Sequence, residues 1–170
     1  MLPTPVEEAS ALPTYVCYTQ SGLLSQEQRR ELARRITGAH SDVTGAPPSF
    51  AQVIFRELLS GGHFIGGRSA PTDSVWIHGH IRNGRTDEAK SRLIRRTCDD
   101  VAEVVSIPRR LVWVYLSELN AAEMIEFGHV LPKHGEEQQW LDGLPSPLRD
   151  DLLAPSPAGV TFSPHPPERR

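Results

Sequence analysis

Two arginines stand three positions apart in the segment IRNGRT, where a strand pattern ends and a helix pattern begins. Arg82 and Arg85 would bring two guanidinium groups to the N-terminal end of that helix, which itself favours anions. Guanidinium groups bind carboxylates through paired hydrogen bonds. The spacing therefore indicates a site for a small carboxylate, while a pair of solvated loop arginines is the plainer reading of the two residues alone.

Three further side chains have types suited to chemistry. His40 ends the first expected helix, Tyr115 alternates with Trp113 on one face of the last expected strand, and Glu126 lies in the largely apolar segment AAEMIEFGHVLP. A carboxylate among apolar neighbours is a candidate general base. Each residue also has a structural explanation: a histidine at a helix C-terminus, a core tyrosine and a surface glutamate on a short helix.

Pro13 directly precedes the alternating strand pattern TYVCYTQ. Proline commonly opens a strand, because its missing N–H costs nothing there. A proline at a true N-terminus is instead a secondary amine that can carry a proton. With Leu12 in front of it, Pro13 is an amide and cannot do so.

Metal and nucleotide sites have weaker support. His78 and His80 share one strand face, but no third ligand has a suggestive spacing. The glycine-rich stretch 60–74 lacks the phosphate-binding glycine motifs. We therefore expect no metal and no cofactor, and we expect Cys17 and Cys98 to be reduced thiols.

The composition describes a soluble globular chain. Its 170 residues are 38% hydrophobic and 23% charged, which is enough for one domain with a hydrophobic core. The net charge of -3 argues against nucleic-acid and acidic-membrane partners. No apolar run approaches the roughly 18 residues of a membrane span. Residues 1–12 lack the features of a secretory signal, so we expect a cytoplasmic protein.

The elements that must position these residues occur twice. Strand patterns cover 14–20, 50–58, 75–81 and 111–119, and helices follow the capping residues Ser25 and Thr86. An offset of 61 aligns the two halves. The aligned residues are Ser25 with Thr86, Leu32 with Leu93, Arg34-Arg35 with Arg95-Arg96, Pro47 with Pro108, and Glu57 with Glu118. The pattern predicts two β-α-β units, each with a parallel strand pair. Both helices would lie on one face of a four-stranded sheet, and oligomerisation would cover the other.

Together, PTYVCYTQ, AHSDVTG, AQVIF, IRNGRT, LVWVYLSEL and MIEFGHVLP resemble the tautomerase superfamily, in its cis-3-chloroacrylic acid dehalogenase subgroup. The resemblance spans 13–152. It implies an α+β fold of two fused β-α-β units, with a mixed parallel and antiparallel sheet, two helices on one face, and a homotrimer. We expect units at 13–59 and 74–120, a C-terminal segment at 121–152, a disordered leader at 1–12 and a disordered proline-rich tail at 153–170.

The resemblance also implies roles for six residues. Arg82, Arg85 and His40 would hold the carboxylate of a small unsaturated or enolic acid. Glu126 and Tyr115 would activate water, and the Pro13 amine would deliver a proton. A dehalogenase, a hydratase of acetylenic acids and a tautomerase all remain compatible with these residues, and the 60–74 loop is expected to lie over the pocket and influence the choice.

The implied mechanism requires a free Pro13 nitrogen. No methionine lies between Met1 and Pro13, but a leucine codon at Leu12 of the CTG or TTG type can initiate translation in bacteria. We therefore expect that the working chain begins at Pro13. The alternative is a non-catalytic carboxylate-binding or assembly module on the same fold, in which the leader blocks the amine.

Overall fold

The computed structural model describes residues 13–46, 51–133 and 136–154. The strands of the main sheet are β1 (Thr14–Gln20), β2 (Gln52–Leu58), β5 (Val75–Arg82) and β6 (Val112–Leu119). The two long helices are α1 (Gln26–Thr44) and α2 (Asp87–Val105), with short 3₁₀ turns at Arg109–Leu111 and Ala121–Glu123. The leader, Pro47 and the tail beyond 154 lie outside the described residues.

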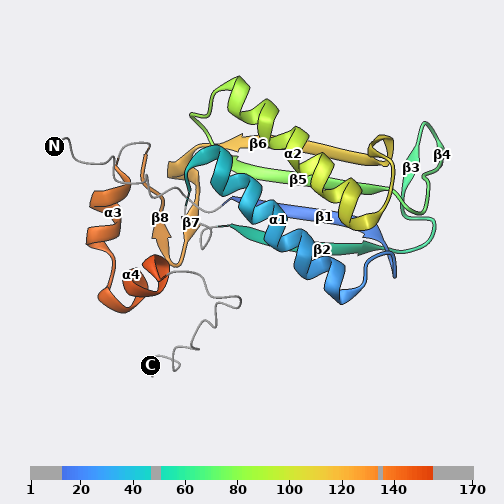
Figure 1. Cartoon of the computed structure of the whole chain (residues 1–170). Coiled ribbons are helices and arrows are strands. Elements are labelled where there is room, and N and C mark those ends of the chain that lie inside the picture. The colour runs from blue at the N-terminus through green and yellow to red at the C-terminus, as the bar shows by residue number, and fades with distance from the viewer. Residues whose placement is uncertain (1–12, 47–50, 134–135, 155–170) are drawn as a thin grey trace.

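The main sheet has the strand order β2-β1-β5-β6. Strand β1 pairs parallel with β2, β5 pairs parallel with β6, and β1 and β5 join the two units in antiparallel register. Helices α1 and α2 lie side by side on one face of this sheet (Figure 1). The predicted pair of β-α-β units, the mixed sheet and the placement of both helices are therefore confirmed.

Local sequence signals set where both helices begin. The Ser25 hydroxyl accepts from the Gln28 N–H at 3.1 Å, and the Gln28 side chain accepts from the Ser25 N–H at 2.9 Å, which completes the predicted capping box. Thr86 caps α2 by accepting from the Ala89 N–H at 3.1 Å. Helix α1 runs past His40 to Thr44, and Gly45 ends it in the left-handed conformation with φ 76°.

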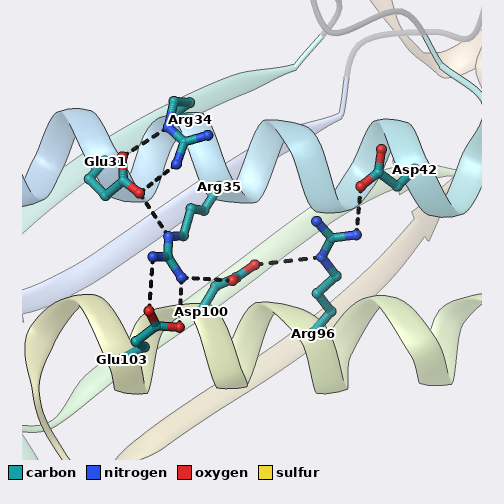
Figure 2. Close-up of polar contacts among 7 residues, drawn as sticks. All are labelled: Glu31, Arg34, Arg35, Asp42, Arg96, Asp100 and Glu103. Carbon is teal, nitrogen blue, oxygen red and sulfur yellow. Dashed lines mark hydrogen bonds and ion pairs between the residues drawn. The ribbon is translucent and has the colours of Figure 1, made fainter.

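The repeat reappears as a symmetric set of ion pairs between the helices. Arg35 on α1 binds Glu103 on α2 with two bonds of 2.8 and 3.0 Å, and Arg96 on α2 binds Asp42 on α1 at 2.6 Å (Figure 2). The offset of 61 relates Arg35 to Arg96 and Asp42 to Glu103, so the two contacts are equivalent. This symmetry supports the alignment of the halves as a true structural repeat.

The core lies between the helices and one sheet face. Its fully or almost fully buried members include Tyr15, Cys17, Leu32, Ile36, Ile77, Leu93 and Val101. Alternate residues point to the other face, where no helix of the described chain packs (Figure 1). There Tyr18 stacks on Trp76 with ring centroids 4.7 Å apart, so the open face is strongly aromatic. Both cysteines are free thiols, with Cys17 buried in the core and Cys98 partly buried.

The C-terminal segment forms a separate small layer beyond one end of the sheet (Figure 1). It contains strands β7 (Ile125–Glu126) and β8 (His129–Val130), and helices α3 (Glu137–Gly143) and α4 (Ser146–Leu153). The expected tail boundary at 153 falls inside α4. Glu126 lies on a strand rather than on the short helix considered from the sequence. Among the described residues, no helix has the length and apolar character needed to cross a membrane.

The glycine-rich stretch forms a hairpin of β3 (Phe64–Ile65) and β4 (Arg68–Ser69). It joins the end of β2 to the start of β5, both at the Gln20 end of β1. Pro13 precedes the opposite end of β1, and the hairpin lies far from the C-terminal segment in Figure 1. The expectation that this loop covers the pocket is therefore wrong within one chain, because the strand directions place it at the other end of the sheet.

Candidate active site

The antiparallel pairing of β1 and β5 brings the candidate residues to one end of the sheet. Thr14 lies opposite His80, so Pro13 at the start of β1 is next to the end of β5, where Arg82 lies. Pro13 is almost fully buried, and its carbonyl accepts from the Gln52 N–H at 2.9 Å. The register thus assembles residues from both halves of the chain at this end.

His40 is held beneath this end by a residue that the sequence analysis missed. The Tyr15 hydroxyl and His40 Nδ1 lie 2.8 Å apart, and the two side chains are buried. Burial, together with the nearby positive charge of Arg85, lowers the pKa of His40 to about 4. The imidazole is therefore neutral at physiological pH.

Arg85 approaches the same place from the loop before α2. Its Nη1 donates to the Thr44 carbonyl at the end of α1 at 3.3 Å. Burial raises the pKa of Tyr15, and the Arg85 charge partly opposes that rise. Because Arg85 acts electrostatically on both Tyr15 and His40, the three groups form one local cluster, with Arg85 as its cation.

Arg82 is buried, with only 2% of its side chain exposed. Its Nη2 donates to Glu137 Oε1 of α3 at 2.5 Å, and its Nη1 donates to the Pro132 carbonyl at 3.2 Å. Its Nε is also buried and has no hydrogen-bond partner among the described residues. The guanidinium is therefore anchored to the C-terminal segment through both Nη atoms, and Nε is its donor without a described partner.

Glu126 lines an open cavity of about 470 Å³ at the start of β1. Thr14, Gln52 and the segment 123–127 form its walls. Thr14 and Gln52 face the open side of the sheet, whereas Tyr15 and His40 lie on the helix side. Pro13 is close to both faces of the sheet, because it directly precedes Thr14, which faces the open side, and Tyr15, which faces the helices. Glu126 is thus brought to the Pro13 end of the sheet.

Tyr115 does not join this group within one chain. Tyr115 lies on β6, opposite His78 of β5. It projects from the open face of the sheet, and 54% of the residue is exposed. The explanation of Tyr115 as a core residue is therefore wrong. His78 binds the Ser117 hydroxyl at 2.7 Å and lies on the same face as His80. No cluster of three metal-binding side chains occurs in the described parts of the chain.

Three positions that matter to this geometry escaped the sequence analysis. Tyr15 looked like one buried strand residue among several, and Glu137 had no helical periodicity around it. Gly79 permits the close approach of two side chains from the neighbouring strands: a Cβ there would lie 2.6 Å from Tyr15 Cε1 and 2.7 Å from Leu116 Cδ2. The spacing of Tyr15 two residues after Pro13 was the only available signal for its place in the site.

Comparisons with known proteins identify the family of this chain. The family model described as "Putative oxalocrotonate tautomerase enzyme" matches residues 12–143. Among solved structures, N1, a member of the cis-3-chloroacrylic acid dehalogenase family, is 40% identical. The match covers 82% of this chain and 97% of N1, with a TM-score of 0.78. The search of curated proteins gave no match.

More distant structures share the fold. Pt0534 inactivated by 2-oxo-3-pentynoate and the F6 fused 4-OT wild-type asymmetric trimer are each 25% identical. Each match covers 69% of this chain and 94% of the other, with a TM-score of 0.64. Together with the match over most of the chain, these similarities show that the chain belongs to the tautomerase superfamily, in its cis-3-chloroacrylic acid dehalogenase-like subgroup.

Proposed function

We propose that this protein is a proline-dependent enzyme that acts on a small unsaturated or enolic carboxylate, of the 3-haloacrylate or acetylenic acid type. The observation that carries the proposal is that Arg85 and the buried neutral His40 lie together at the Pro13 end of the sheet, where β5 also ends in Arg82. These groups offer N–H donors and positive charge to a carboxylate. Membership of the dehalogenase-like subgroup supports the substrate class.

The proposed reaction adds water across the carbon–carbon multiple bond. Arg82, Arg85 and His40 hold the carboxylate and draw electron density from the β-carbon. Glu126, with Tyr115, takes a proton from water as its oxygen attacks the β-carbon, and the protonated Pro13 amine delivers a proton to the α-carbon. With 3-chloroacrylate, the resulting chlorohydrin loses chloride and a proton to give malonate semialdehyde.

Pro13 can act as the acid only if its nitrogen is free. We therefore propose that the working chain begins at Pro13, through initiation at Leu12 and removal of the initiator residue, or through proteolysis. A terminal α-amino group has a pKa near 8, so its protonated form is abundant at neutral pH.

We further propose a homotrimer, as in the F6 relative. No helix of the described chain covers the aromatic open face, and packing against further copies of the chain would cover it. Tyr115 projects from this face, so we expect it to act in the site of a neighbouring subunit. The cytoplasmic location remains a prediction.

The test compares the chain that begins at Pro13 with the full chain. Cis-3-chloroacrylate and an acetylenic acid serve as substrates, with chloride release and NMR of the products as readouts. We expect turnover only with the free amine. Pro13→Ala and Arg85→Ala should each reduce kcat/KM by about 10²-fold or more, whereas Pro71→Ala and Arg68→Ala, at exposed positions near the other end of the sheet, should not. An unchanged kcat/KM in both Pro13→Ala and Arg85→Ala would refute the proposed enzymatic function.

A non-catalytic carboxylate-binding module is the second candidate, because Leu12 makes Pro13 an amide in the sequence as written. It predicts that acrylate binds the full chain and that binding weakens in Arg85→Ala, while neither form of the chain turns over any of these acids. Isothermal titration of acrylate, run beside the turnover assay, separates the two candidates.

A further inference from the structure

A buried phenol–imidazole pair lies directly behind the proposed carboxylate site. Tyr15 is 0% exposed and His40 3% exposed. Their rings meet edge to face at a centroid distance of 5.9 Å, with the Tyr15 hydroxyl 2.8 Å from His40 Nδ1. Tyr15 has no part in the reaction proposed above, yet it is the only hydrogen-bonding partner of the His40 ring among the described residues.

We propose that Tyr15 is a positioning residue: its hydroxyl donates to His40 Nδ1 and so holds the imidazole as the neutral tautomer with the proton on Nε2. The second ring nitrogen then presents an N–H donor to a carboxylate on the ligand. This inference rests on the proposed function for the identity of the ligand, but the tautomer itself does not depend on turnover.

Counting hydrogen bonds decides the direction of the Tyr15–His40 bond. If Tyr15 donates, both the phenol proton and Nδ1 are satisfied, and only His40 Nε2–H is left without a partner. If His40 instead donates from Nδ1, the phenol proton and the Nε2 lone pair are both left unsatisfied in a buried place. An unsatisfied buried polar group costs about 1–3 kcal/mol, so the first arrangement is favoured.

The charge states agree with this arrangement. Burial raises the pKa of Tyr15, so the phenol keeps its proton. Burial and the Arg85 charge hold His40 neutral. His40 Nε2 is buried and unpartnered among the described residues, which is the state expected of a donor that waits for a ligand. Arg85 is the charged group near both rings, and it makes an anion the fitting ligand.

The decisive measurement is the tautomer of His40. Long-range ¹⁵N–¹H spectra of histidine-labelled full chain at pH 7, with the His40 signals assigned by His40→Gln, report which nitrogen carries the proton. We expect Nε2–H in the wild type and a mixture of tautomers in Tyr15→Phe. Tyr18→Phe, on the open face of the same strand, is the matched control and should leave the wild-type spectrum. A proton on Nδ1 in the wild type, or the same tautomer in Tyr15→Phe as in the wild type, would overturn the proposal.

A kinetic readout then tests the consequence for the ligand. In the chain that begins at Pro13, Tyr15→Phe should raise KM for cis-3-chloroacrylate about tenfold, the worth of one charge-assisted hydrogen bond, with a smaller change in kcat. An unchanged KM would overturn the positioning role. If the wild type turns over none of the acids, the proposed function fails, while the spectra still decide whether Tyr15 sets the tautomer.

Discussion

The ion pair between Arg82 and Glu137 offers the sharpest test of how the C-terminal segment is attached to the sheet. Only 2% of the Arg82 side chain and 6% of the Glu137 side chain are exposed. Removing one member of such a pair leaves an uncompensated buried charge, which costs about 3–5 kcal/mol. We therefore expect Glu137→Gln to lower the free energy of unfolding by about 3 kcal/mol or more.

The assay is urea unfolding followed by circular dichroism, at one fixed protein concentration because assembly would contribute to stability. The control is Glu136→Gln, which removes the same charge from the exposed neighbouring residue and should change the free energy of unfolding by no more than about 0.5 kcal/mol. The double variant Arg82→Met with Glu137→Met removes both charges and should recover much of the loss. A loss in Glu137→Gln as small as that of the control would refute the reasoning.

Three further predictions concern the rest of the chain. The folded pKa of His40 lies near 4 against 6.5 in the unfolded chain. The unfolded state therefore binds the extra proton, and the free energy of unfolding should fall by about 3 kcal/mol as pH drops from 6.5 to 4. Urea unfolding midpoints measured across this pH range should show the fall, and His40→Gln should lack it. Gly79→Ala should destabilise the fold by about 1–3 kcal/mol, because the new methyl group overlaps Tyr15; thermal unfolding measures this, and an unchanged midpoint would contradict the close approach. Arg35→Gln should lower stability, and its difference from wild type should shrink in 1 M NaCl, because its partners are partly exposed; a salt-independent difference would contradict an electrostatic origin.

The core architecture was predictable because its signals are local. Ser25 with Gln28 and Thr86 mark the helix starts through contacts within one turn. The offset of 61 then shows that two units share one plan, and a short strand–helix–strand connection leaves few ways to fold. The α3 and α4 helices escaped prediction because neither has a side-chain cap and both are short, so their stability comes from packing within the segment.

The candidate site was predictable only in part. Strand alternation made Tyr15 a buried residue, but its hydrogen bond to His40 spans 25 positions and depends on how α1 crosses the sheet. The same holds for Glu137, 55 positions from Arg82. Tyr115 was assigned to the site by resemblance, whereas the register of β6 against β5 places it on the open face of the sheet, away from Tyr15 and His40.

The sequence by itself determined the repeated β-α-β unit, the starts of the two long helices and the types of residue available for carboxylate chemistry, because caps, periodicity and repeat spacing act over a few residues. Only the tertiary structure decided which of those residues meet. The antiparallel joining of β1 and β5 brings Pro13 to the end that carries Arg82, and places the glycine-rich hairpin at the other end. Burial then decided the chemistry of His40, since the removal of water around its ring lowers its pKa to about 4 and keeps the imidazole neutral.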